Sequence, residues 1–391
     1  MTSEWNHFAL GEITELVIDY RGKTPKKLGG DWCKQGYRAL SAKNIKTGRI
    51  VQAETIRYID ESLYRKWMKD EVQRGDILIT SEAPFGQIFF WDSDEKIVLS
   101  QRLFCVRIKP EYDARFIYYY MTTPEFQSEL DGRATGTTVI GLRQPELMKC
   151  VIRCPEIQEQ KVIAAILSSI DAKIIANEKV NDNLQQQAMS LYAEMFLNSS
   201  DSNVTSGTLS DIAVITMGQS PSGSSYNEDG VGEVFYQGRA EFGFRFPKRR
   251  LFTTEPKRIA EAGDVLLSVR APVGDLNIAY ERCCIGRGLG AIHSKTGHSS
   301  FVLYTMFALR SQLDVFNGEG TVFGSINRDA LNAIPIDIPP VTEIDQFEVV
   351  AHPIDELIRA NYEENCRLEA IRDSLLPKLM SGEIDISAVQ L

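Results

Sequence analysis

From Gly136 onward the chain repeats itself, because nearly every segment recurs at an offset of 184 residues. Gly136-Thr137, for example, returns as Gly320-Thr321. Upstream the match continues with a changing offset, so that the segment Arg74–Gly86 reappears as Ala262–Gly274. A repeat of this length exceeds the roughly 20 to 50 residues of solenoid units, and each copy is therefore expected to fold as a domain with its own core.

The length of 391 residues allows two or three domains, and 43% hydrophobic residues is ordinary for a globular protein. The first residues, Met1–His7, lack a basic region followed by an apolar run, and no stretch approaches the roughly 18 apolar residues of a membrane span. We therefore expect a cytoplasmic protein. The seven cysteines form no Cys-x-x-Cys pair and only four histidines occur, so we expect reduced thiols and no metal site.

The net charge of -10 is concentrated in two segments. Residues 156–197 carry a net charge of -3 and residues 341–391 carry -7, so the two copies themselves are neutral on balance. Each copy contains a basic run: nine Lys or Arg from Arg21 to Arg49, and six from Arg245 to Arg258. One basic run is usually a solvated surface, but a run in each copy favours contact with phosphates.

An apolar seam with alternating three- and four-residue spacing runs from Ile163 to Met195, and the second copy repeats it from Phe347 to Leu379. This spacing is typical of a coiled coil, although two amphipathic helices packed separately on their own domains would also fit. Two consecutive Asn layers interrupt each seam, and buried Asn in a seam specifies register and orientation. The residues expected to pair the helices are Ile170, Ile174, Asn177, Asn181 and Leu184 in the first, and Ile354, Ile358, Asn361, Asn365 and Leu368 in the second.

The connection between the copies predicts how the two helices pair. A short polar linker, Asn198–Gly207, leads from the first helix directly into the second copy, which favours an antiparallel, pseudo-two-fold pair. In that arrangement the central Asn layers meet. A helix of about 40 residues spans roughly 60 Å, so we expect the two domains to be held apart by a rigid spacer.

Short β-branched or aromatic segments bounded by Gly, Pro and Asp predict strands, and the segments between them predict helices. The predicted fold is α+β: two similar domains, each with a twisted and mostly antiparallel sheet, joined by two long helices in an antiparallel coiled coil. The predicted boundaries are 1–155 and 199–340 for the domains, and 156–198 and 341–391 for the helices. Within the copies, strands are expected at 76–80, 96–100 and 103–108, and helices at 60–69, 114–122, 124–130 and 301–310.

The sequence offers no catalytic constellation. Gly22-Lys23-Thr24 resembles the end of a phosphate-binding loop, but Val17 stands where the first Gly is required. Neither Asn-Pro-Pro-Tyr nor Asp-Pro-Pro-Tyr, the methylase tetrapeptides, occurs, and spacing assembles no Ser-His-Asp or Cys-His arrangement. A non-catalytic chain is therefore expected.

Taken in order, these features resemble the specificity subunit of Type I restriction-modification systems. The resemblance rests on the duplicated Gly-Asp-Ile/Val-Leu and Ala-Pro-x-Gly segments, the Gly-Thr loop, the helix start at Pro155–Lys161 and the terminal segment Leu375–Ile384. It covers essentially the whole chain, in the order domain, helix, domain, helix. One departure is Thr342–Gln346, which begins the second helix without the Gln-Glu-Gln found at 158–160.

The resemblance implies a DNA-reading role. In that family each target recognition domain reads one half of a bipartite double-stranded DNA site, and the paired helices set the unread spacer. The helices also dock two methyltransferase subunits, and the assembly can add two restriction subunits. No cofactor is then expected on this chain, whereas S-adenosylmethionine, ATP and Mg are expected on the partner subunits.

The two copies agree in their turns and diverge between them, so we expect the DNA-contacting residues in the divergent loops. Phosphate contacts are expected from Arg21, Lys23, Lys26, Lys27, Lys43, Arg245, Lys248, Arg249 and Arg250, and base or groove contacts from Asn44, Gln237, Arg239 and Arg287. Two alternatives remain: a self-contained DNA methylase or nuclease, which would turn over by itself, and a protein scaffold that does not bind DNA.

Overall fold

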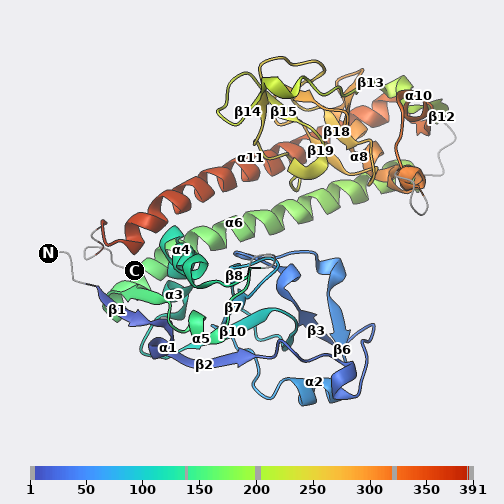
Figure 1. The fold of residues 1–391 in the computed structure, drawn as a ribbon. Coiled ribbons are helices and arrows are strands. Elements are labelled where there is room, and N and C mark those ends of the chain that lie inside the picture. Colours follow the sequence, from blue (N-terminus) through green and yellow to red (C-terminus); the bar gives the residue numbers. More distant parts are fainter. Residues whose placement is uncertain (1–4, 137–139, 199–203, 319–323, 385, 387–391) are drawn as a thin grey trace. The chain divides into compact units, whose positions relative to one another are not determined.

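The computed structural model describes residues 5–136, 140–198, 204–318, 324–384 and 386. The chain divides into two units, Met1–Ile175 with Asn365–Leu391, and Ala176–Glu364. Two long helices, α6 (Ile157–Tyr192) and α11 (Val341–Met380), contribute to both units (Figure 1). The mixed helices and sheets confirm the predicted α+β fold.

The first unit is built on a four-stranded antiparallel sheet. Its strands follow the order β2 (Thr14–Asp19), β10 (Leu103–Ile108), β7 (Ile77–Thr80) and β8 (Ile88–Phe90). Every residue of β7 is buried, which explains its apolar sequence Ile77–Ile79. Helices α3 (Ala114–Met121) and α4 (Pro124–Arg133) supply aromatic side chains to the same core.

A second sheet in this unit contains a parallel strand pair. Strand β3 (Tyr37–Leu40) pairs antiparallel with β6 (Arg57–Ile59) and parallel with β9 (Ile97–Leu99). Helix α2 (Glu61–Trp67) packs its buried Leu63 and Trp67 into the core of this sheet. Sequence analysis anticipated β9 and α2 but not the parallel pairing.

The second unit repeats this plan. Its antiparallel sheet has the order β13 (Ala213–Met217), β21 (Leu289–Ser294), β18 (Val265–Ser268) and β19 (Leu276–Ile278). In its other sheet β15 (Glu233–Tyr236) and β20 (Cys283–Ile285) form a parallel pair. The remaining strands of that sheet are β14 (Tyr226–Asn227), β16 (Phe252–Thr253) and β17 (Ile259–Ala260).

A short two-stranded sheet joins the start of each copy to its end. Strand β1 (Asn6–Ala9) pairs with β11 (Val151–Cys154), and β12 (Thr205–Thr208) pairs with β22 (Pro335–Ile338), both antiparallel. Two pairs of short helices follow the same scheme: α1 (Leu10–Ile13) and α7 (Leu209–Ile212) after β1 and β12, and α5 (Gln144–Leu147) and α10 (Arg328–Asn332) before β11 and β22. In the second unit α8 (Ser299–Ala308) and α9 (Arg310–Asp314) stand at the chain positions that α3 and α4 take in the first.

Most predicted elements lie where the sequence patterns placed them. The strands expected at 76–80, 96–100 and 103–108 correspond to β7, β9 and β10. The helices expected at 60–69, 114–122, 124–130 and 301–310 correspond to α2, α3, α4 and α8. The bounds differ by at most three residues, and the repeated Thr137, Gly320 and Thr321 lie outside the described residues.

Within the first unit, α6 and α11 run antiparallel. Arg372 forms an ion pair with Asp171 at 2.9 Å, and Asn365 Nδ2 donates to the carbonyl of Ile174 at 3.4 Å. From the first contact to the second, the position advances from 171 to 174 on α6 and goes back from 372 to 365 on α11, so the helices run in opposite directions. Arg372 thus occupies a seam position but forms a charged contact there.

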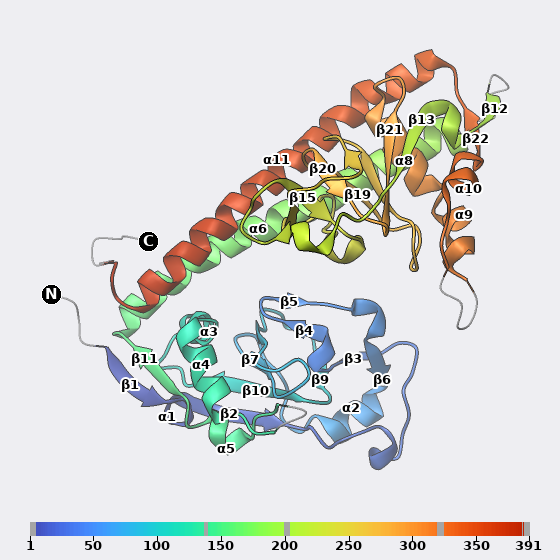
Figure 2. The same ribbon diagram turned by 45° about the horizontal axis from the view of Figure 1, so that its top comes forward.

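Within the second unit the helices are again antiparallel (Figures 1 and 2). Asn361 Nδ2 donates to Asn181 Oδ1 at 2.8 Å, so these two Asn layers meet as expected. Asn177 Nδ2 donates to Glu364 Oε2 at 2.7 Å. The antiparallel orientation is thereby confirmed in each unit.

The predicted seam lies on the inner face of both helices. Buried positions among the predicted pairing residues are Ile174, Asn177, Asn181, Ile358 and Asn365, and half-buried positions are Ile170, Leu184, Ile354, Asn361 and Leu368. The helices are shorter than the predicted segments 156–198 and 341–391. Helix α6 gives way to a π-helical turn at Ala193–Leu197, and α11 ends at Met380, two residues before Gly382 with its φ of 74°. Residues 387–391 lie outside the described residues.

Candidate nucleic-acid interface

In each unit the parallel strand pair ends in two adjacent loops. In the first unit, Ser100 N donates to the carbonyl of Leu40 at 2.8 Å where β3 and β9 end. In the second, Gly286 N donates to the carbonyl of Tyr236 at 2.8 Å where β15 and β20 end. These equivalent hydrogen bonds place the loop after the first strand beside the loop after the second in both units.

The loop that precedes the Ala-Pro-x-Gly turn joins the same edge in both units. Ser81 N donates to the carbonyl of Arg102 at 2.8 Å, and the equivalent Val269 N donates to the carbonyl of Gly288 at 3.0 Å. The scaffold is therefore the same in the two units, whereas the side chains on it differ. An edge of this kind can present different chemistry without a change of fold.

In the first unit this edge surrounds a pocket of about 240 Å³. Its lining includes Lys43 after β3, Arg57 on β6, and Gln101 and Arg102 after β9, together with Trp32. Three of these side chains are cationic, and none of the described residues that line the pocket carries a carboxylate. The surface is suited to a polyanion or to the electronegative edge of a base.

The cations of the pocket differ in their partners. Arg102 Nε lies 2.9 Å from Oε1 of Glu82, and both side chains are partly exposed. The Arg57 guanidinium lies over the Trp32 ring, 5.1 Å from its centroid. Lys43 is exposed and has no polar partner among the residues that the structure describes.

The structure does not favour the DNA contact that the sequence led us to expect from Asn44. The residue is 1% exposed, and both polar atoms of its amide have partners. Oδ1 accepts from the Ser41 hydroxyl at 2.8 Å, and Nδ2 donates to the Gln52 carbonyl at 3.2 Å and the Thr55 hydroxyl at 3.0 Å. Asn44 therefore holds the 3-10 turn Ala42–Asn44 that presents Lys43.

In the second unit the same edge carries the predicted residues Gln237, Arg239 and Arg287. All three are exposed, and the first two follow β15 while Arg287 follows β20. A Cβ at Gly286 would approach the Gln237 backbone to 2.9 Å, so glycine is needed for the close approach of the two loops. The structure thus brings the three predicted residues of this unit together.

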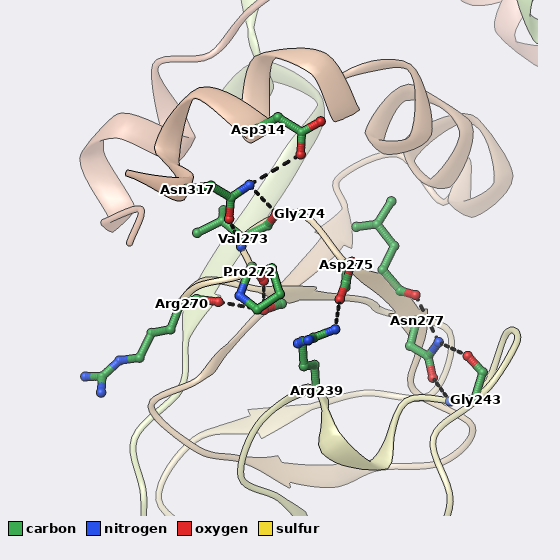
Figure 3. Close-up of polar contacts among 12 residues, drawn as sticks. Arg239, Gly243, Arg270, Pro272, Val273, Gly274, Asp275, Asn277, Asp314 and Asn317 are labelled. Atoms are coloured by element: carbon green, nitrogen blue, oxygen red, sulfur yellow. Dashed lines mark hydrogen bonds and ion pairs between the residues drawn. The ribbon is translucent and has the colours of Figure 1, made fainter. Parts of the chain in front are cut away.

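Arg239 lies in an ion-pair network. It pairs with Asp275 (Figure 3). The Asp275 carboxylate is also 3.0 Å from Arg310. The exposed Arg270 side chain points away from this group, although it comes from the same loop. Gln237 and Arg287 are therefore better placed for an incoming ligand than Arg239.

The start of the first basic run makes mostly intramolecular contacts. Arg21 forms two hydrogen bonds of 2.8 Å with the Asp19 carboxylate and stacks 4.0 Å above the Phe104 ring. Lys23 donates to the Trp67 carbonyl at 2.5 Å, and burial lowers the pKa of its ammonium group. Lys27 donates to the Gly22 carbonyl at 2.8 Å, while Lys26 is exposed. Lys26 and Lys27 keep the exposure that phosphate contact requires, whereas Arg21 and Lys23 are held by the scaffold.

Arg245, at the start of the second basic run, is buried and ion-paired in this structure, which does not favour the phosphate contact expected from the sequence. Its side chain is 3% exposed, and Nη1 lies 3.0 Å from Asp355 Oδ1. Lys248, Arg249 and Arg250 are exposed. Arg249 pairs with Glu281 and Arg250 with Glu241 at 2.7 Å, so both arginines would have to share or exchange their carboxylates to bind DNA.

Sequence analysis missed Arg57, Gln101 and Arg102. Arg57 lies beyond the basic run that ends at Arg49, and the other two form an isolated pair between strands. The repeat contained the missing signal, because Gln101 aligns with Arg287, which was selected. Extending each selected residue to its partner in the other copy would have found this position.

The described residues contain no group of three or more His, Cys, Asp or Glu side chains arranged to hold a metal ion. In the same part of the chain, no helix combines the length and apolar character needed to cross a membrane. The cysteines described are free thiols, and burial raises the pKa of Cys150 and Cys154 to about 12.

Comparison with known proteins matches the chain twice to the Type I restriction modification DNA specificity domain, over residues 2–186 and 201–365. A Methanocaldococcus jannaschii protein named as the specificity subunit of type I restriction enzyme MjaX is 29% identical, covering 98% of this chain and 94% of its own. The MjaIX specificity subunit of that organism is 23% identical over 80% of this chain and 78% of its own. The solved structure of a Type I restriction-modification S subunit from M. genitalium superposes with a TM-score of 0.60 at 16% identity, covering 96% of both chains.

Proposed function

Because the chain belongs to the Type I restriction modification DNA specificity family, we propose that its two domains each read one half of a bipartite double-stranded DNA site. The chain is a DNA sequence-recognition subunit and a non-catalytic component of its system. The observation that supports two half-sites is the edge described above, which occurs once in each unit with the same backbone hydrogen bonds and different side chains. Neither a self-contained methylase or nuclease nor a scaffold without DNA is favoured by this family membership.

The DNA backbone would be held by the exposed members of the two basic runs. We assign this role to Lys26, Lys27 and Lys43 in the first domain and to Lys248, Arg249 and Arg250 in the second. Each such contact releases counterions and carries no sequence information. Gln237 and Arg287 would read base edges in the second half-site, with Arg239 as a further candidate that must first leave Asp275.

The long helices would set the distance between the half-sites. In this proposal residues 1–155 and 199–340 are the target recognition domains, and residues 156–198 and 341–391 form the spacer. The antiparallel contacts within each unit support a paired spacer, since the Asn181–Asn361 bond fixes its register.

The partners proposed for this chain are two methyltransferase subunits and two restriction subunits, with S-adenosylmethionine, ATP and Mg bound on those partners and none on this chain. Helix α11 exposes Val349 (75%), Val350 (48%) and Leu357 (48%), which is unusual for a solvated helix face. We assign this face to the methyltransferase contact. Because its DNA substrate lies in the cytoplasm, we place the complex there.

Methylation mapping in a cell that carries this system tests the proposal directly. A bipartite site with two specific parts and an unread spacer is expected, and a continuous or absent site would refute it. Insertion of one seven-residue repeat into each long helix preserves the seam and adds about 10.5 Å, which corresponds to about three base pairs of added spacer.

The proposed phosphate contacts are tested by binding at several salt concentrations, with the methyltransferase subunits present. Lys43→Ala and Lys248→Ala should each weaken binding to all duplexes alike and lower the salt slope by about one. Lys66→Ala, which removes an exposed lysine on α2, is the matched control and should leave the slope unchanged. An unchanged slope in both test variants would remove these residues from the interface.

A further inference from the structure

We infer that the pocket at the ends of β3 and β9 reads one base pair of the first half-site through Arg102, and that Glu82 is the positioning residue for this arginine. This inference rests on the proposed function. It assigns a reading role to side chains that lie outside the basic runs. The ligand is the guanine edge of a G·C pair in the major groove, whose O6 and N7 atoms accept two hydrogen bonds from a guanidinium.

The backbone of Arg102 has an uncommon conformation. Its φ of 66° lies in the left-handed region, which residues other than glycine rarely adopt. Ala83, which lines the same pocket, also has a positive φ, of 46°. Such conformations persist where the surrounding structure imposes them, and they gather at ligand-binding sites. Here the bond from Ser81 N to the Arg102 carbonyl fixes the loop.

The side chain of Arg102 contacts Glu82 and keeps donors for a further partner. Its Nε faces Glu82 Oε1 at 2.9 Å, and the Arg102 side chain remains 48% exposed. A guanidinium carries five N–H donors in a rigid fork, so one carboxylate contact leaves donors for a second, planar partner. Among the residues that the structure describes, the terminal nitrogens of Arg102 have no hydrogen-bond acceptor.

The carboxylate of Glu82 makes Arg102 better suited to read a base than to bind a phosphate. A carboxylate beside the guanidinium cancels part of its charge and repels the DNA backbone, which makes this pair a poor phosphate anchor. The same carboxylate restricts the rotamers of Arg102 and can accept from the amino group of the paired cytosine. Lys43 and Arg57, whose only described partner is the Trp32 ring, are the better phosphate anchors of this pocket.

The second unit shows that the pair does not belong to the common scaffold. At the positions equivalent to Glu82, Gln101 and Arg102 it has Arg270, Arg287 and Gly288, while the loop hydrogen bond is kept. The acidic Glu82 is thus replaced by the basic Arg270. The arginine of the other loop stands one residue earlier in the second unit, at the position equivalent to Gln101. The Glu82–Arg102 pair therefore acts on the first half-site alone.

The test uses the chain assembled with its methyltransferase subunits and duplexes in which each base pair of both mapped half-sites is replaced in turn. Arg102→Ala should lower the discrimination at one G·C pair of one half-site by about 5- to 140-fold and leave all other positions unchanged. Arg102→Lys should lose the same discrimination, because it keeps the charge but not the planar fork. Glu82→Gln should relax the same base pair by a smaller factor.

Arg65→Ala is the matched control, since Arg65 is an exposed arginine paired with Glu61 on α2 of the same unit. It should leave discrimination unchanged at every position. Equal weakening of all duplexes by Arg102→Ala, with rescue by Arg102→Lys, would make Arg102 a phosphate contact and overturn the inference. Unchanged discrimination in a folded Arg102→Ala variant would also overturn it. Both outcomes leave the proposed function intact, whereas a wild-type complex without sequence preference would refute that function itself.

Discussion

Replacement of Arg245 by alanine should destabilise the second unit, although the residue stands in a basic run. Nη1 lies 3.0 Å from Asp355 Oδ1, and the Tyr304 hydroxyl donates to the same oxygen at 2.9 Å. The guanidinium also lies 5.8 Å from the centroid of the Tyr304 ring and 5.7 Å from that of Phe307. Removal of the arginine leaves a largely buried carboxylate without its cation and opens a void between these rings.

The magnitude follows from the burial of the pair. Removing one partner of a buried ion pair typically costs about 3–5 kcal/mol. Asp355 keeps 14% exposure, so water partly compensates and the lower half of that range is expected. For a folding unit of 150–250 residues, each kcal/mol lowers the midpoint temperature by about 2–4 °C. The expected shift is therefore about 6–16 °C.

Arg249→Ala is the control for this prediction. Arg249 lies four residues away, has one carboxylate partner in Glu281, and its side chain is 54% exposed. An exposed ion pair is worth about 0–1 kcal/mol, so this variant should unfold close to the wild type. Far-UV circular dichroism follows both units, and hydrogen exchange of the peptides that cover α8 locates the loss in the second unit.

If Arg245→Ala unfolded like Arg249→Ala and at the same time lowered the salt slope of DNA binding by about one, Arg245 would be a phosphate contact. An Arg245→Met, Asp355→Leu double variant provides a second check. Replacing the whole pair by apolar side chains should restore part of the stability, because no buried charge is left without a partner.

Three further predictions concern the helices, the thiols and alkaline pH. Asn181→Leu should lower the free energy of unfolding by about 1–3 kcal/mol, because Asn361 loses its hydrogen-bond acceptor. Adding Asn361→Leu to the same chain should recover most of this loss. Equal denaturation midpoints for the single and double variants would contradict this prediction. A thiol reagent should label Cys33 and Cys366 rapidly and the five buried cysteines only after unfolding, as mass spectrometry of labelled peptides can show. Burial raises the pKa of Tyr118 to about 12 from 10.0, so the folded state holds this proton more tightly. The stabilisation is complete below pH 10, and about 3 kcal/mol is lost as the pH rises through 12. Tyr118→Phe should reduce this loss in urea titrations at about pH 9 and 11.

Elements with a local periodic pattern could be predicted from the sequence, whereas the pairing of distant segments could not. The helices and the seam were predictable because the three-four spacing reports directly which residues face the partner helix. The pairing of β3 with β9 was not, since a parallel pair joins segments far apart in the chain and leaves no local periodic signal. The edge that carries the candidate interface depends on that pairing.

Charge patterns predicted the individual contacts less well. A run of Lys and Arg does not reveal which side chains are exposed, and Arg245 is buried while Lys248 three residues later is not. Nor does a run reveal local partners: Arg21 is held by Asp19, and Arg250 by Glu241. Isolated arginines such as Arg102 were missed because only the fold brings them to the same edge as Lys43.

The turn after the first parallel strand suggests how one scaffold carries two specificities. In both units this turn is a short 3-10 helix whose third residue is a buried polar side chain, Asn44 in one and Glu241 in the other. Asn44 is held by the neutral groups around it, whereas Glu241 is held by Arg250. A buried polar side chain thus fixes the turn in each unit, and the exposed residues beside it, Lys43 and Arg239, do not hold the turn. Substitution of Arg239 should therefore change what is read, and substitution of Lys43 should weaken binding to all sequences, with the fold kept in both cases. Substitution at the buried positions should disturb binding to every sequence by displacing the turn.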